Sequence, residues 1–263
     1  QQQWGASFSA GLERYLASNW SISLWASRTQ RSAGLSERFI NSFPIGVDPY
    51  EIIGNTNLEV ETNWQSDFTL AYASSQFSSS VNVFYSRIQD FIAAYVVEGL
   101  QPRMMSSPGV RAFQNIDVAE RYGFEWQGKW NMSRNLEQQF SMAYTHATDL
   151  ELDEPLPEIA PMDLRYSIQW THSKTDLNHR LQVRHVLEQD RISPSFGEVS
   201  TPSFTTLDWS SRFEVNAQVQ LNLQIQNLLN EQYFEHLNRM SRLSAQPLFA
   251  PGRNIILTAS YRF

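Results

Sequence analysis

Hydrophobic and polar residues alternate along most of this chain. Gln218–Gln226 places four aliphatic residues on one face and five amide side chains on the other. Leu164–Thr171 and Ile255–Phe263 follow the same pattern, with aromatic residues among the apolar positions. A period of two predicts β-strands with one apolar and one polar face. No comparable stretch has helical periodicity, so we predict an all-β chain.

The alternating segments define eleven predicted strands. They cover roughly residues 5–14, 18–30, 64–75, 78–97, 111–131, 136–150, 162–173, 178–190, 203–215, 218–229 and 252–263. Short connections rich in Ser, Asn, Lys and Asp alternate with long ones that hold most of the proline. Tight turns at one end and long loops at the other are typical of an outer-membrane barrel. Tilted strands of about nine residues or more can cross the hydrocarbon layer.

The two faces of these strands favour a membrane protein, although a mean hydropathy of −0.41 alone would suit a soluble one. The apolar face is rich in Trp, Tyr and Phe near strand ends, and the polar face carries charges that a closed soluble core would bury at high cost. A β-sandwich would have shorter strands, and a β-solenoid would show a fixed repeat. We therefore expect a transmembrane antiparallel β-barrel with a charged lumen.

Composition excludes several other classes. The longest apolar run, Phe91–Val97, has seven residues, whereas a membrane-spanning helix needs about 20. The absence of cysteine excludes a disulfide scaffold, a thiolate metal site and a cysteine nucleophile. The net charge of −7 argues against a nucleic-acid partner. No spaced nucleophile–base pattern predicts an enzyme, and we expect no cofactor.

The odd strand count predicts an incomplete barrel. Single-chain bacterial barrels have even numbers of strands, and eleven would leave the first and last strands running in the same direction. Eleven is also half of the twenty-two strands of the large outer-membrane transporters. The chain begins at Gln1 without a recognisable signal peptide. We therefore expect residues 1–263 to be the C-terminal portion of a larger barrel.

Several segments resemble the C-terminal half of TonB-dependent outer-membrane receptors. Leu35–Phe39 followed by Gly54–Thr62 is similar to a loop of that family, with Thr56 and Val60 where proline is usual. Gln226–Tyr233 is similar to the signature at the top of the penultimate strand, and Pro251–Asn254 to the start of the final strand. Phe113–Asn115 with Arg121–Glu125 resembles a descending strand of these receptors.

The resemblance implies a barrel of twenty-two strands around an N-terminal plug, with the plug and the first strands absent from this chain. It implies a receptor in the outer membrane of a Gram-negative bacterium, which takes up a scarce metal complex such as a ferric siderophore, haem, cobalamin or a copper species. Its partners would be the metal chelate, outer-membrane lipid, the barrel assembly machinery and the inner-membrane TonB energy-coupling complex. The last of these would be reached through the absent N-terminal region.

Candidate functional residues follow from the same patterns. Tyr261 and Phe263 look like the C-terminal signal that the assembly machinery recognises, although an ordinary last strand would also contain such residues. Arg239 and Arg242 are suited to attract an anionic chelate, and Tyr95 and Phe113 to stack on an aromatic ligand. Alternatively, the aromatic residues pack the barrel rim. Met104, Met105, His236 and Met240 carry soft ligands suited to copper, unless the Met residues only pack the loops and His236 is a hydrogen-bonded loop residue.

Charged residues on the polar face should project into the lumen. These are Arg121, Glu125, Lys129, Arg165, Arg184, Asp208, Arg212 and Glu214. We expect them to hold the plug through exchangeable salt bridges, to pair across strands within the wall, or to do both.

Three other functions remain open at this stage. A passive porin-like channel of about twelve strands would conduct ions. An outer-membrane phospholipase would need a Ser–His pair on adjacent outward positions, and we find none. A soluble β-rich binding protein would suit the mean hydropathy but not the composition of the two faces.

Overall fold

A computed structural model describes residues 4–41, 48–175, 177–238 and 246–263. Its main strands are β1 (Phe8–Ala17), β2 (Trp20–Arg31), β4 (Glu61–Ala73), β5 (Phe77–Val96), β6 (Val110–Ser133), β7 (Leu136–Asp149), β9 (Asp163–His172), β10 (Leu177–Val186), β11 (Phe204–Glu214), β12 (Val219–Gln226) and β13 (Asn254–Tyr261). Two short strands, β3 (Glu51–Ile53) and β8 (Glu154–Pro155), and helix α1 (Leu35–Phe39) lie in the long connections. The described part of the chain holds no helix with the length and apolarity needed to cross a membrane.

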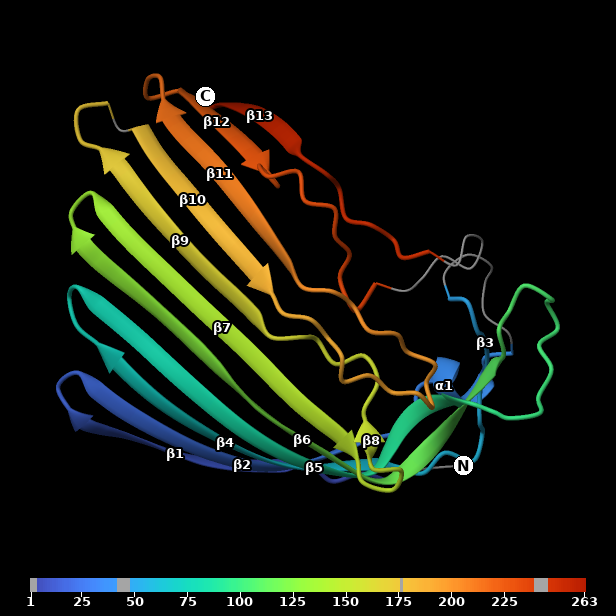
Figure 1. Ribbon diagram of the computed structural model, residues 1–263. Helices are drawn as coiled ribbons and strands as arrows, with labels where there is room; N and C mark the ends of the chain where they lie inside the picture. The colour runs from blue at the N-terminus through green and yellow to red at the C-terminus, as the bar shows by residue number, and fades with distance from the viewer. Residues whose placement is uncertain (1–3, 42–47, 176, 239–245) are drawn as a thin grey trace.

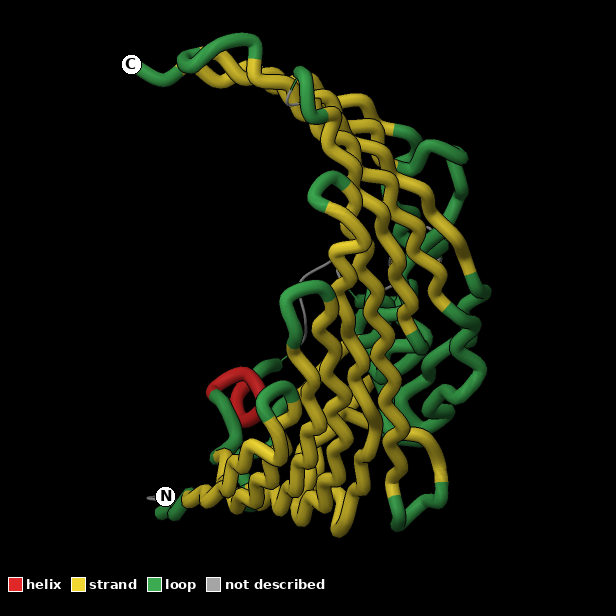
Figure 2. Tube along the Cα trace, turned by 90° about the vertical axis from the view of Figure 1, so that its left-hand side faces the viewer, coloured by secondary structure: helices red, strands yellow, loops and turns green. Residues whose placement is uncertain are grey.

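The main strands form one antiparallel ladder in chain order, from β1 to β13. Strand β3 pairs in parallel with β6, and β8 pairs with β7. Within the described residues, β1 and β13 are the two edges of the sheet, which curves into an open trough (Figures 1 and 2). The predicted all-β fold and the eleven main strands are confirmed, and the unclosed wall agrees with part of a larger barrel.

The connections divide the molecule into two ends. Short turns join β1 to β2, β4 to β5, β6 to β7, β9 to β10 and β11 to β12, along the left side of Figure 1. We call this the turn end. The long connections gather at the opposite side, which we call the loop end. Polar side chains close the turns: Asn216 Oδ1, for example, accepts hydrogen bonds from the backbone amides of Gln218 (2.9 Å) and Val219 (2.8 Å).

Strand register keeps side chains of one kind on the same face. Asn82 on β5 lies opposite Thr69 on β4 and Glu125 on β6, and its Nδ2 donates to Thr69 Oγ1 at 2.8 Å. One step along, Val83 lies opposite Phe68 and Phe124. We call the first set the polar face and the second the apolar face.

The apolar face is the more exposed of the two. On β4, Trp64 and Phe68 are 48% and 44% exposed, whereas the alternating polar residues Asn63, Gln65 and Asp67 are half-buried. A water-soluble protein would bury its large aromatic residues instead. The reversed order is the arrangement of a barrel wall whose outside meets lipid.

Aromatic residues form two bands on the apolar face. The turn-end band includes Trp20, Tyr72 and Phe77, with ring centroids 4.9 and 6.0 Å apart. The loop-end band includes Trp64 and Tyr122. On β4 and β6 the bands are eight residues apart, from 64 to 72 and from 122 to 130, or about 26 Å along a strand. A tilt of about 40° reduces this to about 20 Å, close to the apolar band of about 25 Å in outer-membrane barrels.

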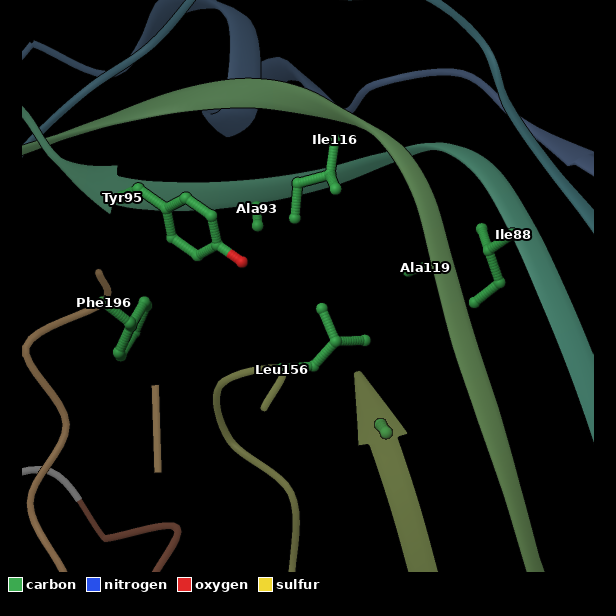
Figure 3. Close-up of a cluster of buried hydrophobic side chains, with 8 residues drawn as sticks. Ile88, Ala93, Tyr95, Ile116, Ala119, Leu156 and Phe196 are labelled. Atoms are coloured by element: carbon green, nitrogen blue, oxygen red, sulfur yellow. The ribbon is translucent and has the colours of Figure 1, made fainter. Parts of the chain in front are cut away.

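The buried apolar core lies at the loop end rather than along the sheet. Strands β5 and β6 are 20 and 24 residues long and extend past the loop-end band. Figure 3 shows Tyr95 of β5 and Ile116 of β6 facing Leu156 and Phe196, which come from the long connections after β7 and β10. The extended hairpin is therefore the scaffold on which the other loops pack.

Candidate functional site

The loop end is organised around a buried ion pair. Arg111 on β6 and Asp48, in the connection between β2 and β3, have side chains only 4% and 1% exposed. Nη1 of Arg111 lies 3.1 and 3.2 Å from the two carboxylate oxygens of Asp48, and its Nε donates to the carbonyl of Phe196 at 2.7 Å. A buried charge is tolerated only when it is paired and hydrogen-bonded. The pair therefore fixes two loops to the β5–β6 hairpin.

Aromatic rings cover this guanidinium. Its Cζ lies 3.6 Å from the ring centre of Phe196 and 4.1 Å from that of Tyr50. Gly197 has a φ of +75°, and a Cβ at this position would lie 2.3 Å from the Tyr50 hydroxyl oxygen. Only glycine fits this backbone conformation and this space. The loop between β10 and β11 is thus shaped to bring Phe196 over Arg111.

A second contact ties the β12–β13 connection to the same loop. His236 Nε2 lies 3.0 Å from Glu198 Oε1, and His236 Nδ1 lies 3.2 Å from Thr201 Oγ1. Burial alone would raise the pKa of the Glu198 carboxyl. The contact with His236 and hydrogen bonds from the backbone amides of Ser193 and Glu158 outweigh this effect and lower the pKa below its ordinary value. The described geometry therefore holds Glu198 as a carboxylate.

A cavity of about 240 Å³ lies between these loops. Its lining includes Arg111, Phe196, Glu198, Phe234 and His236. Aromatic walls with a few fixed charges are the usual composition of small-molecule sites. The cavity is a partly open space at the loop end with room for a small ligand group.

Two of the four predicted ligand residues, Tyr95 and Phe113, lie within the described residues. Tyr95 is 4% exposed, and its hydroxyl donates to Asp149 Oδ2 at 2.9 Å; burial and this bond raise its pKa. Tyr95 therefore packs inside the core and does not present its ring to the cavity. Phe113 is half-buried on β6, opposite Ala94 of β5. Arg239 and Arg242 lie outside the described residues.

Three of the four predicted copper ligands, Met104, Met105 and His236, lie within the described residues, and their role as copper ligands stays a prediction. Met105 is fully exposed, and the backbone amide of its neighbour Met104 donates to Glu51 at 2.7 Å. His236 is occupied by Glu198 and Thr201, and Met240 lies outside the described residues. Among the residues that the structure describes, no three His, Asp or Glu side chains form a group that could hold a metal ion.

The charged residues predicted for the lumen share the polar face. Register connects them across the sheet: Arg121 lies opposite Ala147, Arg165 opposite Arg184, and Arg212 opposite both Asn178 and Asn222. Glu125, Lys129, Asp208 and Glu214 lie in phase with them. An open groove of about 490 Å³ on this face is lined by residues that include Arg180, Arg212 and Glu214.

Some of these charges are paired within the wall. The Asp163 carboxylate accepts hydrogen bonds from Arg165 Nη2 and Arg184 Nε, both at 2.9 Å. Arg184 also forms a salt bridge with Glu235 of the β12–β13 connection. Lys129 Nζ lies 2.7 Å from Glu137. By contrast, Glu125, Arg212 and Glu214 make no salt bridge within the described ranges of the chain. The polar face therefore contains both wall-stabilising pairs and charges open to a molecule in the trough.

Tyr261 and Phe263 lie at the turn end of β13, on the unpaired edge of the sheet. Their ring centroids are 5.1 Å apart, and both side chains are exposed. Their role as an assembly signal stays a prediction.

Sequence reasoning missed the two contacts that shape the loop end. Arg111 and Asp48 are 63 positions apart, and Glu198 and His236 are 38 apart, so no local pattern connects them. One sequence signal did exist, because the uninterrupted apolar run Phe91–Val97 indicates burial on both faces. It marks the segment of β5 that extends past the loop-end band and enters the core.

Known structures share this architecture. The copper transporter OprC superposes with a TM-score of 0.82 at 20% identity, covering 97% of this chain and 39% of that chain. The FrpB iron transporter from Neisseria meningitidis (F3-3 variant) gives 0.69 at 17% identity, covering 97% and 38%. The siderophore receptor PirA from Acinetobacter baumannii gives 0.71 at 14% identity, covering 98% and 41%. This chain thus spans about two fifths of the structures that it matches.

A match in sequence assigns the chain to a family more specifically than similarity of fold does. No curated protein sequence matches the chain. However, the family model described as "TonB dependent receptor-like, beta-barrel" matches residues 1–228, which is most of the chain. The antiparallel sheet also has one apolar and one polar face, with its short turns at one end and its long loops at the other. Together with these features, the match shows that the chain belongs to the TonB-dependent receptor family and forms part of its β-barrel.

Proposed function

We propose that this chain is the C-terminal part of the barrel of an outer-membrane receptor that takes up a scarce metal complex in Gram-negative bacteria. The observation that carries the proposal is the family match over residues 1–228. The described sheet supports it, because the apolar face is the more exposed one and carries two aromatic bands, while the residues of the polar face are more buried. The loop end would face the outside of the cell and the turn end the periplasm, as in other outer-membrane barrels.

The polar face would line the lumen and contact a plug domain outside this chain. Glu125, Arg212 and Glu214 are suited to this role, because they have no ion-pair partner among the described residues of the wall. Plug movement would require energy from the inner-membrane TonB complex. Binding at the loop end and energised release through the lumen would together constitute transport.

The ligand would bind among the loops as a preformed metal complex. The names of the similar structures include a copper transporter, an iron transporter and a siderophore receptor. Both ring nitrogens of His236 are already occupied, so a bare copper ion would have to displace Glu198 or Thr201 from it. A chelate that brings its own metal ligands requires no such rearrangement. We therefore favour a ferric siderophore over a copper ion held by His236 and the methionines.

The proposal is tested by uptake into cells that express the full-length receptor. Cells receive a panel of ⁵⁵Fe-siderophores or ⁶⁴Cu, with and without a functional TonB complex. We expect saturable ⁵⁵Fe uptake that is lost without TonB. Uptake that rises linearly with concentration and does not need TonB would instead establish the passive channel. The double variant M104L/M105L separates the two metals, because it should reduce uptake of copper only if copper is bound by these thioethers.

A further inference from the structure

The polar face contains an open hollow in the half of the trough nearer the turn end. Its volume is about 590 Å³, and it extends across the strands from β4 to β10. Apart from three cations, Lys129, Arg165 and Arg180, the polar-face residues that line it are Ala, Ser and Gln, and no Asp or Glu is among them. Ser hydroxyls and Gln amides donate hydrogen bonds without adding charge. The lining is therefore rich in donors.

Two of the three cations are neutralised within the wall. Lys129 Nζ lies 2.7 Å from Glu137 Oε2, and Arg165 Nη2 lies 2.9 Å from Asp163 Oδ2. Arg180 differs from both, because it forms no salt bridge with any described residue. It is therefore the cation of the hollow that is available to an anion.

The hydrogen bonds of Arg180 orient its guanidinium but leave donors unused. Nη2 donates to two neutral acceptors, Ser167 Oγ at 3.2 Å and Gln139 Oε1 at 3.4 Å. Nε is buried and has no hydrogen-bond partner, and Nη1 donates to no described residue. A half-buried guanidinium normally has its N–H groups bound by acceptors. The missing acceptor points to a ligand in the hollow.

The nearby carboxylates do not supply that acceptor. Asp208 on β11 lies two positions toward the loop end from the residue opposite Arg180, and it accepts a backbone N–H at 2.7 Å. Glu214 lies four positions toward the turn end from the same residue. Glu125 on β6 and Asp67 on β4 are three and five strands away from β10. The charge of Arg180 thus stays without a counter-ion in the described wall.

Arg212 adds a second cation beside Arg180. It lies opposite Asn178, two positions along β10 from Arg180, and it lines the neighbouring groove of about 490 Å³, which Arg180 lines as well. The two cavities therefore adjoin at Arg180. Diagonal neighbours on adjacent strands are about 7–8 Å apart, so both guanidinium groups can reach oxygen atoms of one ligand.

We propose that the hollow at Arg180 is a binding site in the lumen for the anionic oxygen groups of the metal complex in transit. Arg180 binds a carboxylate, catecholate or hydroxamate through paired N–H donors, and the Ser and Gln side chains donate to the neutral oxygen atoms of the chelate. The site lies on the wall, apart from the cavity at the loop end. It rests on the proposed function, which supplies the solute that passes along this wall.

The first test uses charged thiol reagents and requires no identified ligand. Ser141 is exposed in the hollow, and Ser9 lies on the same face of β1, outside the hollow. Each is replaced by cysteine in the full-length receptor without other cysteines. Reaction rates with a sulfonate and a trimethylammonium methanethiosulfonate are compared in outer-membrane vesicles. We expect a higher anionic-to-cationic rate ratio for S141C than for S9C.

Removal of the Arg180 charge should change this ratio in the hollow only. R180Q should lower the ratio for S141C roughly tenfold, because a charge about 8 Å from the thiol acts with opposite sign on the two reagents. R180K should keep the ratio, and S9C should not respond to R180Q. An S141C thiol that neither reagent modifies would show that another part of the receptor fills the hollow, and would overturn the proposal. A ratio for S141C that does not respond to R180Q would also overturn it.

Uptake tests whether the bound anion is the transported complex. In cells that take up a ⁵⁵Fe-siderophore, R180Q should lower the saturated uptake rate several-fold and leave surface binding at 0 °C unchanged. The control R14Q removes a cation from the apolar face near the turn end, opposite Ile22, and should change neither quantity. Normal uptake by R180Q would overturn the assignment of the ligand. No ⁵⁵Fe uptake by the wild-type receptor, with the expected thiol reactivity, would instead refute the proposed function and leave the anion site standing.

Discussion

Single residues decide how the loop end is held together, and Asp48 is the clearest case. Its carboxylate is 1% exposed and lies against Arg111, which is also buried. We expect D48N to weaken the local stability of these loops by about 3–5 kcal/mol, because it leaves a buried charge without its counter-ion. Hydrogen exchange at the Val96 amide, which donates to Ser195, measures this opening.

The control for D48N is R31Q. Arg31 pairs with Glu37 and Glu61 on an exposed surface, where ion pairs contribute less than about 1 kcal/mol. Exchange at Val96 that is equally fast in both variants would show that the buried ion pair stabilises these loops no more than an exposed pair does.

We expect the contact between Glu198 and His236, which joins two loops, to be sensitive to acid. Its pKa is below the ordinary value of 4.5, so the folded state favours the carboxylate. The resulting stabilisation is complete above about pH 4.5 and is lost as the pH falls through the depressed pKa. We expect the β12–β13 connection to detach on acidification below pH 4.5, as followed by a fluorophore on that connection. The variant E198Q should remove this transition, and E98Q, at an exposed loop position, should keep it.

Gly197 and Gly99 form a matched pair of left-handed glycines. Their φ angles are +75° and +78°, but a Cβ would meet Tyr50 only at Gly197 and nothing within 4 Å at Gly99. G99A should therefore cost only the backbone strain, about 1–2 kcal/mol. G197A should cost more, because it also displaces the ring that covers Arg111. Urea unfolding of the two variants compares them, and equal midpoints would contradict the described packing.

At the scale of elements, alternation was sufficient to predict the eleven main strands, because each strand has one face to expose and one to cover. The register of Asn82 with Glu125 and of Val83 with Phe124 shows this directly. Strands β3 and β8 and helix α1 were not predictable in this way. They have two to five residues, and β3 exists only where β6 extends far enough to pair with it.

The same reasoning explains why the surroundings of the candidate site residues could not be predicted from the sequence. Tyr95 is an aromatic residue of the kind that stacks on ligands, but the extension of β5 beyond Asp90 carries it into the core beside Phe196. Its environment is set by the long connections that pack on it, and these contacts carry no periodic signal. The charged residues of the polar face were accessible to sequence reasoning because their phase within a strand fixes the face on which they lie.

The two faces predict opposite responses to charge at adjacent positions of β5. Val83 lies opposite Phe68, midway between the aromatic bands on the apolar face. We expect V83K to destabilise the membrane-embedded protein by about 2–4 kcal/mol, because it places a charge in hydrocarbon. N82K, on the polar face, should cost less than about 1 kcal/mol. Urea midpoints in lipid vesicles give both values, and a larger loss for N82K would reverse the assignment of the faces.

At the scale of the whole molecule, the two edge strands of the sheet run in the same direction. Both β1 and β13 run from the loop end to the turn end, so a second copy standing in the same orientation would bring these edges together in parallel. Antiparallel closure requires a segment with an odd number of strands. The N-terminal barrel strands of the proposed receptor would meet that requirement, and the plug would then occupy the space beside the polar face.

The central claim is that the apolar face meets lipid while the polar face lines the lumen, and site-directed spin labelling tests it most directly. This chain contains no cysteine, so single cysteines introduced at Val83, Leu223, Asn82 or Gln224 are the only labelling sites within it. In outer-membrane vesicles of the full-length receptor, we predict that oxygen relaxes the labels at Val83 and Leu223 more than a water-soluble nickel complex does. The labels at Asn82 and Gln224 should show the lower oxygen contact. Higher oxygen contact at Asn82 and Gln224 than at Val83 and Leu223 would contradict the account.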